Sequence, residues 1–230
     1  MTSATTHRRD DALTDWLRIR TRIPWPSWNG PRPVTRPPAR DAFRDFFTTT
    51  RGSRDAEGTR RVLTALDLAL AHAAQGRPLT FALMSAWQRT VLHRTSADFR
   101  TAPAYAKGGR ERYGLAADTR ARFEHCLSES TQPDLSLPAR AARAHLDVLF
   151  FHPFEDGNAR AAMLTLAFVL AREGVPLAQV HPLQTTRWAD DTEGAAELAV
   201  LLGILMDAKP PAGPPRACPA AHVRGGPARS

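Results

Sequence analysis

The sequence predicts a mainly helical protein, all-α in class, that carries one small β-hairpin. Apolar residues recur at helical spacing in several long stretches, as Met84, Trp87 and Val91 do in one of them. Residues 94–117 lose this periodicity, and the pair Gly108-Gly109 within them is a hairpin-type turn signal. A length of 230 residues, with 43% hydrophobic residues, most simply forms one domain with flanking tails.

The helical stretches have recognisable ends. Thr80 is a predicted N-cap, and Gly76 and Gly174 stand where helices are expected to stop. Pro-rich or irregular segments separate the stretches, which are predicted over residues 41–48, 62–75, 80–92, 118–130, 139–151, 161–174 and 192–207.

Three parts of the chain differ in composition. Residues 1–40 form a Pro- and Arg-rich arm with a linker at 31–38, and 209–230 form a tail without periodicity that we expect to be disordered. Residues 41–208 form the helical domain between them. The arm contains Trp16 and Trp25, which predict that it packs on the domain; a peptide-like docking element is the alternative.

Charge and cysteine content indicate which partners and which cellular compartment to expect. The net charge of +8 belongs to the flanks, because residues 62–208 hold fourteen basic and sixteen acidic side chains. A nucleic-acid-binding face is therefore not expected. Cys126 and Cys218 form no disulfide framework, which fits the cytoplasm. We find no apolar signal region and no apolar run that could span a membrane.

The most informative stretch runs from Phe151 to Arg160, Phe-His-Pro-Phe-Glu-Asp-Gly-Asn-Ala-Arg. The Gly-Asn pair precedes a helix, so free backbone N–H groups and the helix dipole favour a phosphate there. Asp156 can hold a divalent cation, and Arg160 can bind phosphate oxygens. His152 can take a proton near neutral pH. His145, two turns earlier, has no further metal-ligand spacing around it and is predicted to be a packed residue.

At these residues the chain resembles the Fic-domain family, whose signature reads His-x-Phe-x-Asp/Glu-Gly-Asn-Gly-Arg-x-x-Arg. Six of the eight signature residues match. Ala159 replaces the signature glycine, and Met163 replaces the second arginine. The resemblance implies a mainly helical Fic fold with a β-hairpin flap, and the segment around Gly108-Gly109 is in the position expected for that flap.

The resemblance also implies a chemistry, the transfer of AMP from ATP-Mg to a hydroxyl of a protein or peptide. It makes His152 the general base and Asp156 the ligand of Mg²⁺. Residues Gly157, Asn158, Ala159 and Arg160 are expected to bind the nucleotide. Phe154 is expected to anchor the loop in the core.

Other resemblances lie outside this stretch. Residues 53–58 fit an N-terminal inhibitory motif, with Ser53 and Glu57 as its candidates. The usual partner of the glutamate is the arginine that Met163 replaces, so either Glu57 pairs with Arg160 or the switch is vestigial. Two residues near the predicted flap, Arg100 and Lys107, are candidates to reach the phosphates in place of that arginine; an exposed basic loop is the alternative.

The two departures from the Fic signature, Ala159 and Met163, leave three possible functions open. Losing one charge-assisted contact costs roughly 1.5–3 kcal/mol, so the affinity for ATP is in question. The first hypothesis is an AMP-transferring enzyme. The second is an enzyme of the same fold that uses a different phospho-donor or a small-molecule hydroxyl acceptor in a biosynthetic pathway. The third is a degenerate, non-catalytic module. A homo-oligomer is compatible with each of them.

Overall fold

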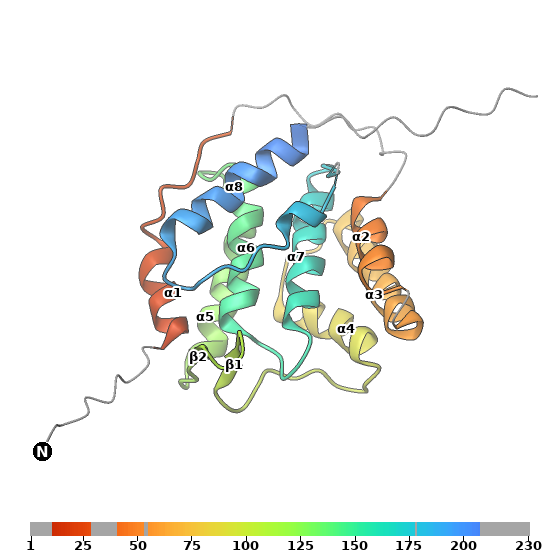
Figure 1. The fold of residues 1–230 in the computed structure, drawn as a ribbon, viewed down its shortest axis with the longest axis horizontal. Helices are drawn as coiled ribbons and strands as arrows, with labels where there is room; N and C mark the ends of the chain where they lie inside the picture. Colours follow the sequence, from red (N-terminus) through yellow and green to blue (C-terminus); the bar gives the residue numbers. More distant parts are fainter. Residues whose placement is uncertain (1–10, 29–40, 53–54, 178, 208–230) are drawn as a thin grey trace, which may run out of the picture.

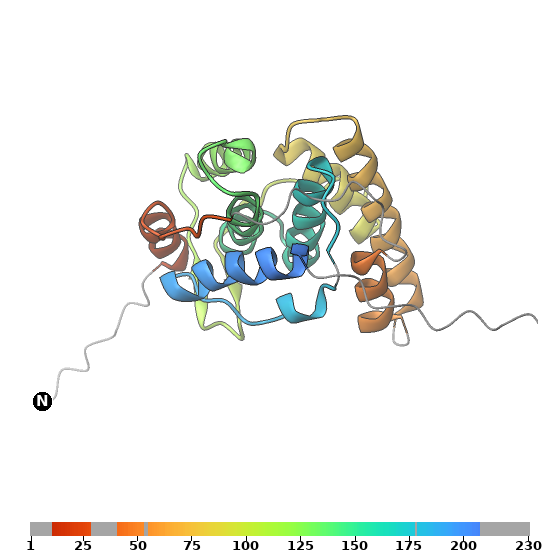
Figure 2. The ribbon, with the colours of Figure 1, turned by 90° about the horizontal axis from the view of Figure 1, so that it is seen from above.

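The computed structural model describes residues 11–28, 41–52, 55–177 and 179–207. Two antiparallel helices, α6 (Leu137–Phe151) and α7 (Asn158–Arg172), form the centre of the molecule (Figures 1 and 2). Nearly every residue of both helices is buried. A helix that is apolar all round must be covered on every side, and the other elements provide that cover.

The covering elements pack around this central pair. Helix α3 (Ala56–Ala74) lies against α7, and α8 (Thr192–Asp207) crosses α6 on the face seen in Figure 1. Four more helices complete the shell: α1 (Ala12–Arg20), α2 (Ala42–Arg51), α4 (Phe81–Leu92) and α5 (Thr119–Ser128). Short 3₁₀ turns occur at Glu129–Thr131 and His181–Leu183.

The predicted hairpin is present. Strand β1 (Ala104–Ala106) pairs antiparallel with β2 (Glu111–Tyr113), and Ala106 faces Glu111 across the ladder. The turn places Lys107, Gly108 and Gly109 at positive φ, a region that glycine tolerates best. The glycine pair therefore marks this turn because of its backbone requirement, as predicted.

The helix boundaries agree with the sequence to within a few residues, except in two places. Helix α3 begins six residues before the predicted start, because Asp55 caps it by accepting a hydrogen bond from Gly58. Helix α1 contains Trp16 and lies in the arm, where no helix was predicted. The linker 31–38 and the tail 209–230 lie outside the described residues.

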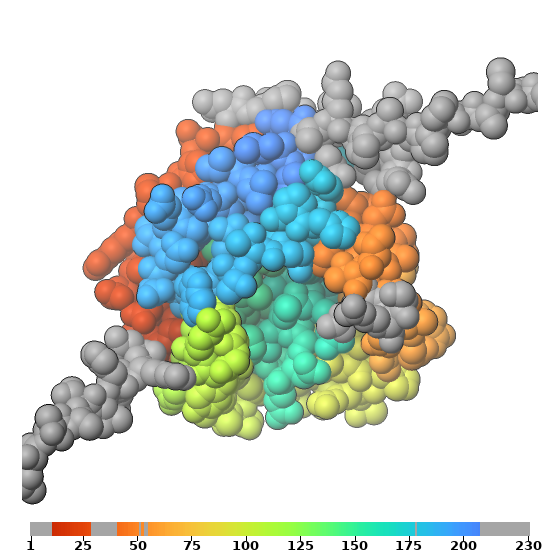
Figure 3. Space-filling view, viewed as in Figure 1, coloured from red at the N-terminus to blue at the C-terminus, as the bar shows by residue number. Residues whose placement is uncertain are grey.

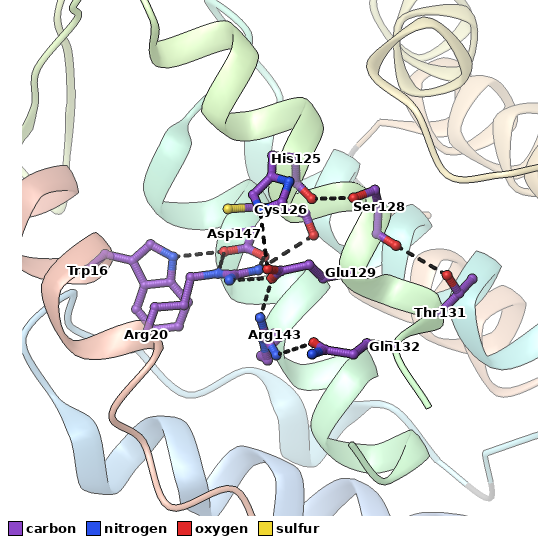
Figure 4. A network of polar contacts seen from close by, with 10 residues as sticks. All are labelled: Trp16, Arg20, His125, Cys126, Ser128, Glu129, Thr131, Gln132, Arg143 and Asp147. Atoms are coloured by element: carbon purple, nitrogen blue, oxygen red, sulfur yellow. Dashed lines mark hydrogen bonds and ion pairs between the residues drawn. The ribbon is translucent and has the colours of Figure 1, made fainter. Parts of the chain in front are cut away.

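A buried polar cluster fastens α1 to α6 (Figure 4). The guanidinium of Arg20 binds both carboxylate oxygens of Asp147 at 2.6 and 2.7 Å, and the indole of Trp16 donates to the same carboxylate at 2.9 Å. Glu129 accepts from Arg20 on the other side, and Arg143 also pairs with it. Because Trp16 is fully buried, this part of the arm packs on the domain, as predicted from its tryptophans.

Among the described residues, no helix combines the length and apolarity needed to cross a bilayer.

Candidate active site

The loop between the two central helices begins at His152. This residue adopts a left-handed conformation, φ 49°, and so ends α6 abruptly. The six residues 152–157 then reverse the chain into α7. The two most buried helices of the core therefore hold both ends of the loop, which is the rigid support that a functional loop needs.

The imidazole of His152 is held in a defined orientation. Its Nδ1 lies 2.9 Å from the carbonyl oxygen of Leu149, and its ring stacks on Tyr113 at 4.9 Å between centroids. A carbonyl can only accept, so Nδ1 carries the proton and Nε2 is left with a lone pair. Burial lowers the pKa of His152 below its usual value, and the hydrogen bond to Leu149 opposes this only in part. The ring is therefore neutral at pH 7.

A side-chain bridge closes the loop on itself. The amide of Asn158 donates to the Phe154 carbonyl at 2.8 Å and accepts from the Phe154 backbone N–H at 3.0 Å. Phe154 is buried and stacks on Phe81, in keeping with its expected role as an anchor. The side chain of Asn158 is therefore used within the loop, which leaves its backbone N–H as the group that can face a ligand.

Gly157 is required by both its conformation and its surroundings. Its φ is +79°, and a Cβ added there would come within 2.3 Å of the side-chain nitrogen of Gln88. Gln88 lies on α4, is fully buried and donates to the Asp156 carbonyl at 2.6 Å. Sequence reasoning missed Gln88; its signal was an amide on the apolar face of a helix, next to Trp87.

The charged residues of the loop remain close to solvent. The Asp156 carboxylate is 66% exposed; it accepts from the Gly157 N–H at 2.6 Å and lies 3.5 Å from the Arg160 guanidinium. Ala159 is exposed at the first turn of α7. Met163, one turn further, is buried, and its sulfur lies 3.8 Å from the side-chain nitrogen of Gln184. No charge occupies the position of the second signature arginine.

Arg100 has a role other than the predicted one. It lies before the hairpin, is 4% exposed and donates to the carbonyls of Phe151, Ala102 and Gly114. Its own N–H donates to Pro153. Its guanidinium is thus committed to holding the start of the loop, and burial lowers its pKa. The prediction that Arg100 reaches the phosphates is therefore not supported by its contacts.

Lys107 lies in the hairpin turn, and its side chain has partners within the protein. Its ammonium pairs with Glu111 and lies 4.4 Å from the centre of the Trp188 ring. Glu111 is buried and also accepts from the Tyr113 hydroxyl and from the Ala189 N–H. This carboxylate, which sequence reasoning also missed, joins the hairpin to the segment before α8. Lys107 can move toward a ligand only if it leaves Glu111.

The inhibitory candidates are only partly described. Ser53 lies outside the described residues. Glu57 is exposed in the first turn of α3 and forms an ion pair with Arg60. Arg160 forms an ion pair with Asp156, and Glu57 forms one with Arg60. The structure therefore does not contain the pairing between Glu57 and Arg160 that the sequence left open.

Around the loop the surface is hollowed. In the space-filling view, the surface of α7 lies recessed between the hairpin, the segment before α8, and helices α2 and α3 (Figure 3). The described residues contain no group of three or more potential metal-binding side chains. A single carboxylate such as Asp156 suits Mg²⁺, which is commonly held by one or two carboxylates together with substrate phosphates.

Comparison with known proteins agrees with this arrangement. Residues 78–170 match the model of the Fic/DOC family. A segment of 67 residues, 29% of this chain, is 34% identical to the protein adenylyltransferase Fic of Drosophila virilis, of whose length it spans 14%. The crystal structure of a Fic domain containing signaling protein from Bacteroides thetaiotaomicron superposes with a TM-score of 0.53 and 21% identity, over 70% of this chain and 74% of that one. Residues 78–170 thus resemble the Fic/DOC family, and the helical architecture of the chain is the Fic fold.

Proposed function

We propose that this protein is a nucleotidyltransferase that moves AMP from ATP to a hydroxyl group of a protein or peptide. The observation that carries the proposal is the state of His152. Its Nδ1 is bound to a backbone carbonyl and its pKa is lowered, so Nε2 has a lone pair at neutral pH in the loop that leads into α7. A neutral base next to an anion-binding helix end is what transfer to a hydroxyl needs.

The reaction divides between the two sides of the loop. Nε2 of His152 accepts the proton of the attacking hydroxyl, whose oxygen forms a bond to the α-phosphorus. The bond from that phosphorus to the bridging oxygen breaks, and pyrophosphate leaves. Backbone N–H groups in the first turn of α7 stabilise the charge on the α-phosphate, because they point out of the helix end.

Asp156 is the residue proposed to hold Mg²⁺. Its exposed carboxylate requires little desolvation, and only one of its oxygens is engaged by the Gly157 N–H. When bound, the ion neutralises charge on the phosphates of the donor. Arg160, now 3.5 Å from Asp156, is close enough to share the same phosphates.

The test is transfer of label from α-labelled ATP to the protein itself or to a partner. His152→Ala should lower the rate about 100-fold or more, the range for loss of a general base. His125→Ala is the matched control, since His125 is an exposed histidine on α5. Activity that persists in His152→Ala, or falls equally in both variants, contradicts the assignment of the base.

A second candidate follows from Met163. A buried thioether that contacts Gln184 provides no charge for the outer phosphates of ATP. This observation favours a different phospho-donor, with a protein or a small molecule as acceptor. Thermal shift separates the cases, because a ligand that binds the folded state raises the melting temperature. Stabilisation by ATP-Mg supports the first candidate, stabilisation by another donor alone supports the second, and no response to any nucleotide favours a non-catalytic module.

Glu57 is retained as a proposed inhibitory residue. The Glu57→Gly variant should raise the transfer rate if this carboxylate restrains nucleotide binding. An unchanged rate would show that Glu57 does not inhibit transfer and that its role is the ion pair with Arg60.

A further inference from the structure

A second polar surface lies outside the loop, between the first half of α3 and the end of α4. The two helices pack side by side and leave an open groove of about 730 Å³ between them. We name it the arginine groove; the side chains used below are Glu57, Arg60, Arg61, Arg89, His93 and Arg94.

The charge of the groove is strongly positive. Its lining contains four arginines and one carboxylate, whereas acidic residues outnumber basic ones over 62–208 as a whole. A hydrogen bond from Arg60 lowers the pKa of Glu57, and the charges of Arg61 and His93 act in the same direction. The one carboxylate of the groove is therefore stabilised in its ionised form, chiefly by Arg60.

Within the described part of the chain, much of this charge has no strong ion partner. Arg94 and Glu155 are 3.9 Å apart, and both are more than half exposed. The Nε–H of Arg61 is buried and donates to no described residue. Exposed ion pairs contribute little, so Arg60 can exchange Glu57 for another carboxylate at small cost.

The lining also indicates what kind of anion fits. Besides the charged groups and His93 it consists of threonine side chains, and none of the described lining residues is Phe, Tyr or Trp. Proteins that bind single-stranded nucleic acids usually stack bases on aromatic rings, which this groove does not provide. Guanidinium groups spread along two helices match several separate carboxylates, as in an acidic peptide, better than one compact phosphate.

The groove adjoins the candidate active site. Arg94 faces Glu155 of the loop, and Gln88, which binds the Asp156 carbonyl, precedes Arg89 on α4. A chain bound in the groove would therefore pass close to the loop.

We propose that the arginine groove binds a segment of a partner protein that is rich in aspartate and glutamate. The proposal concerns binding, so it stands whether or not the protein transfers AMP. It also identifies the groove as a surface distinct from the hairpin and from the nucleotide loop.

The test measures binding of a fluorescent oligoglutamate peptide by anisotropy at low and physiological salt. The double variant Arg89→Glu/Arg94→Glu should weaken binding about tenfold or more, since it replaces two attractive contacts by repulsive ones. The control Arg18→Glu/Arg122→Glu makes the same change in net charge. Its arginines are 59% and 57% exposed, against 58% for Arg94, and each has an ion partner on its own helix.

The outcomes are distinct. Loss of binding in the groove variant with retention in the control supports the proposal. Equal weakening of both variants shows a nonspecific charge effect and overturns it. Binding of tripolyphosphate or an oligothymidine in the groove, without binding of the peptide, also overturns it. Circular dichroism checks that each variant is folded. If the charge reversal impairs folding, the variant Arg89→Gln/Arg94→Gln takes its place and should weaken binding to a smaller extent.

Discussion

Two polar clusters lie five residues apart on the same central helix and differ in how completely their groups are satisfied. Around Asp147 the carboxylate is fully buried, and its oxygens receive donors from Arg20 and Trp16 (Figure 4). Around His152 the ring is only partly buried, Asp156 is mostly exposed, and no described residue forms a hydrogen bond with Nε2.

The difference indicates what each cluster is for. A buried ion pair with all its hydrogen bonds made has nothing left to offer a ligand, and its groups hold α1 on α6. A base, a carboxylate and a helix end with unused capacity are suited to chemistry. Charge alone does not distinguish the two clusters; the Asp147 carboxylate receives its donors within the fold, whereas the Asp156 carboxylate remains open to solvent.

The largest expected effect comes from breaking the structural cluster. Asp147→Ala removes the fully buried carboxylate that binds Arg20, leaving Glu129 as its carboxylate partner, and should lower the free energy of unfolding by about 3–5 kcal/mol. His152→Ala should change it by about 1 kcal/mol or less, because the ring is near the surface. Denaturant unfolding measures both. The double variant Arg20→Met/Asp147→Leu, which replaces both charges, should recover most of the lost free energy of unfolding. If it does not, the cluster stabilises the fold by more than the neutralisation of one charge by the other.

The next effect concerns the support of the loop. Gly157→Ala should lower the transfer rate about tenfold or more, because the new Cβ meets Gln88 and displaces the Asp156 backbone. Gly174→Ala is a close control: its φ is +70°, but no atom lies within 4 Å of the added Cβ. It carries a similar backbone cost of about 1–2 kcal/mol without the clash. Similar transfer rates in the two variants would show that the contact with Gln88 does not matter.

A smaller effect concerns pH. Because burial lowers the pKa of His152, its neutral, active form persists below the usual histidine value of 6.5. The transfer rate should therefore be constant across neutral pH and fall only in the acid range, as Nε2 takes a proton. Rates measured against pH under first-order conditions test this. An acid limb centred above 6.5 would contradict the lowered pKa.

The smallest effect is expected at an exposed ion pair. Arg44 and Asp67 join α2 to α3 with side chains 42% and 61% exposed. Arg44→Ala should change the free energy of unfolding by about 0.5 kcal/mol or less, since solvent and salt screen such pairs. A loss comparable to that of Asp147→Ala would show that burial is not what separates strong from weak pairs in this protein.

Local patterns account for what could be predicted. The helices, the hairpin turn and the loop from His152 to Arg160 follow from apolar periodicity, capping and positive φ, all of which act within a few residues. The contacts of Arg100, Gln88 and Glu111 could not be predicted in this way. Gln88 lies 68 residues from Asp156, and Glu111 lies 78 residues from Ala189.

By itself, the amino-acid order determined most helix boundaries, α1 and the start of α3 excepted, and which short segment combines a base, a carboxylate and a helix N-terminus. The tertiary structure alone decided how charged groups are used: Arg100 as a brace for the loop, Asp147 as the partner of Arg20, and Glu57 beside Arg60. The physical reason is that hydrogen bonds and desolvation depend on distances of a few ångströms between groups far apart in the chain, and only folding sets those distances.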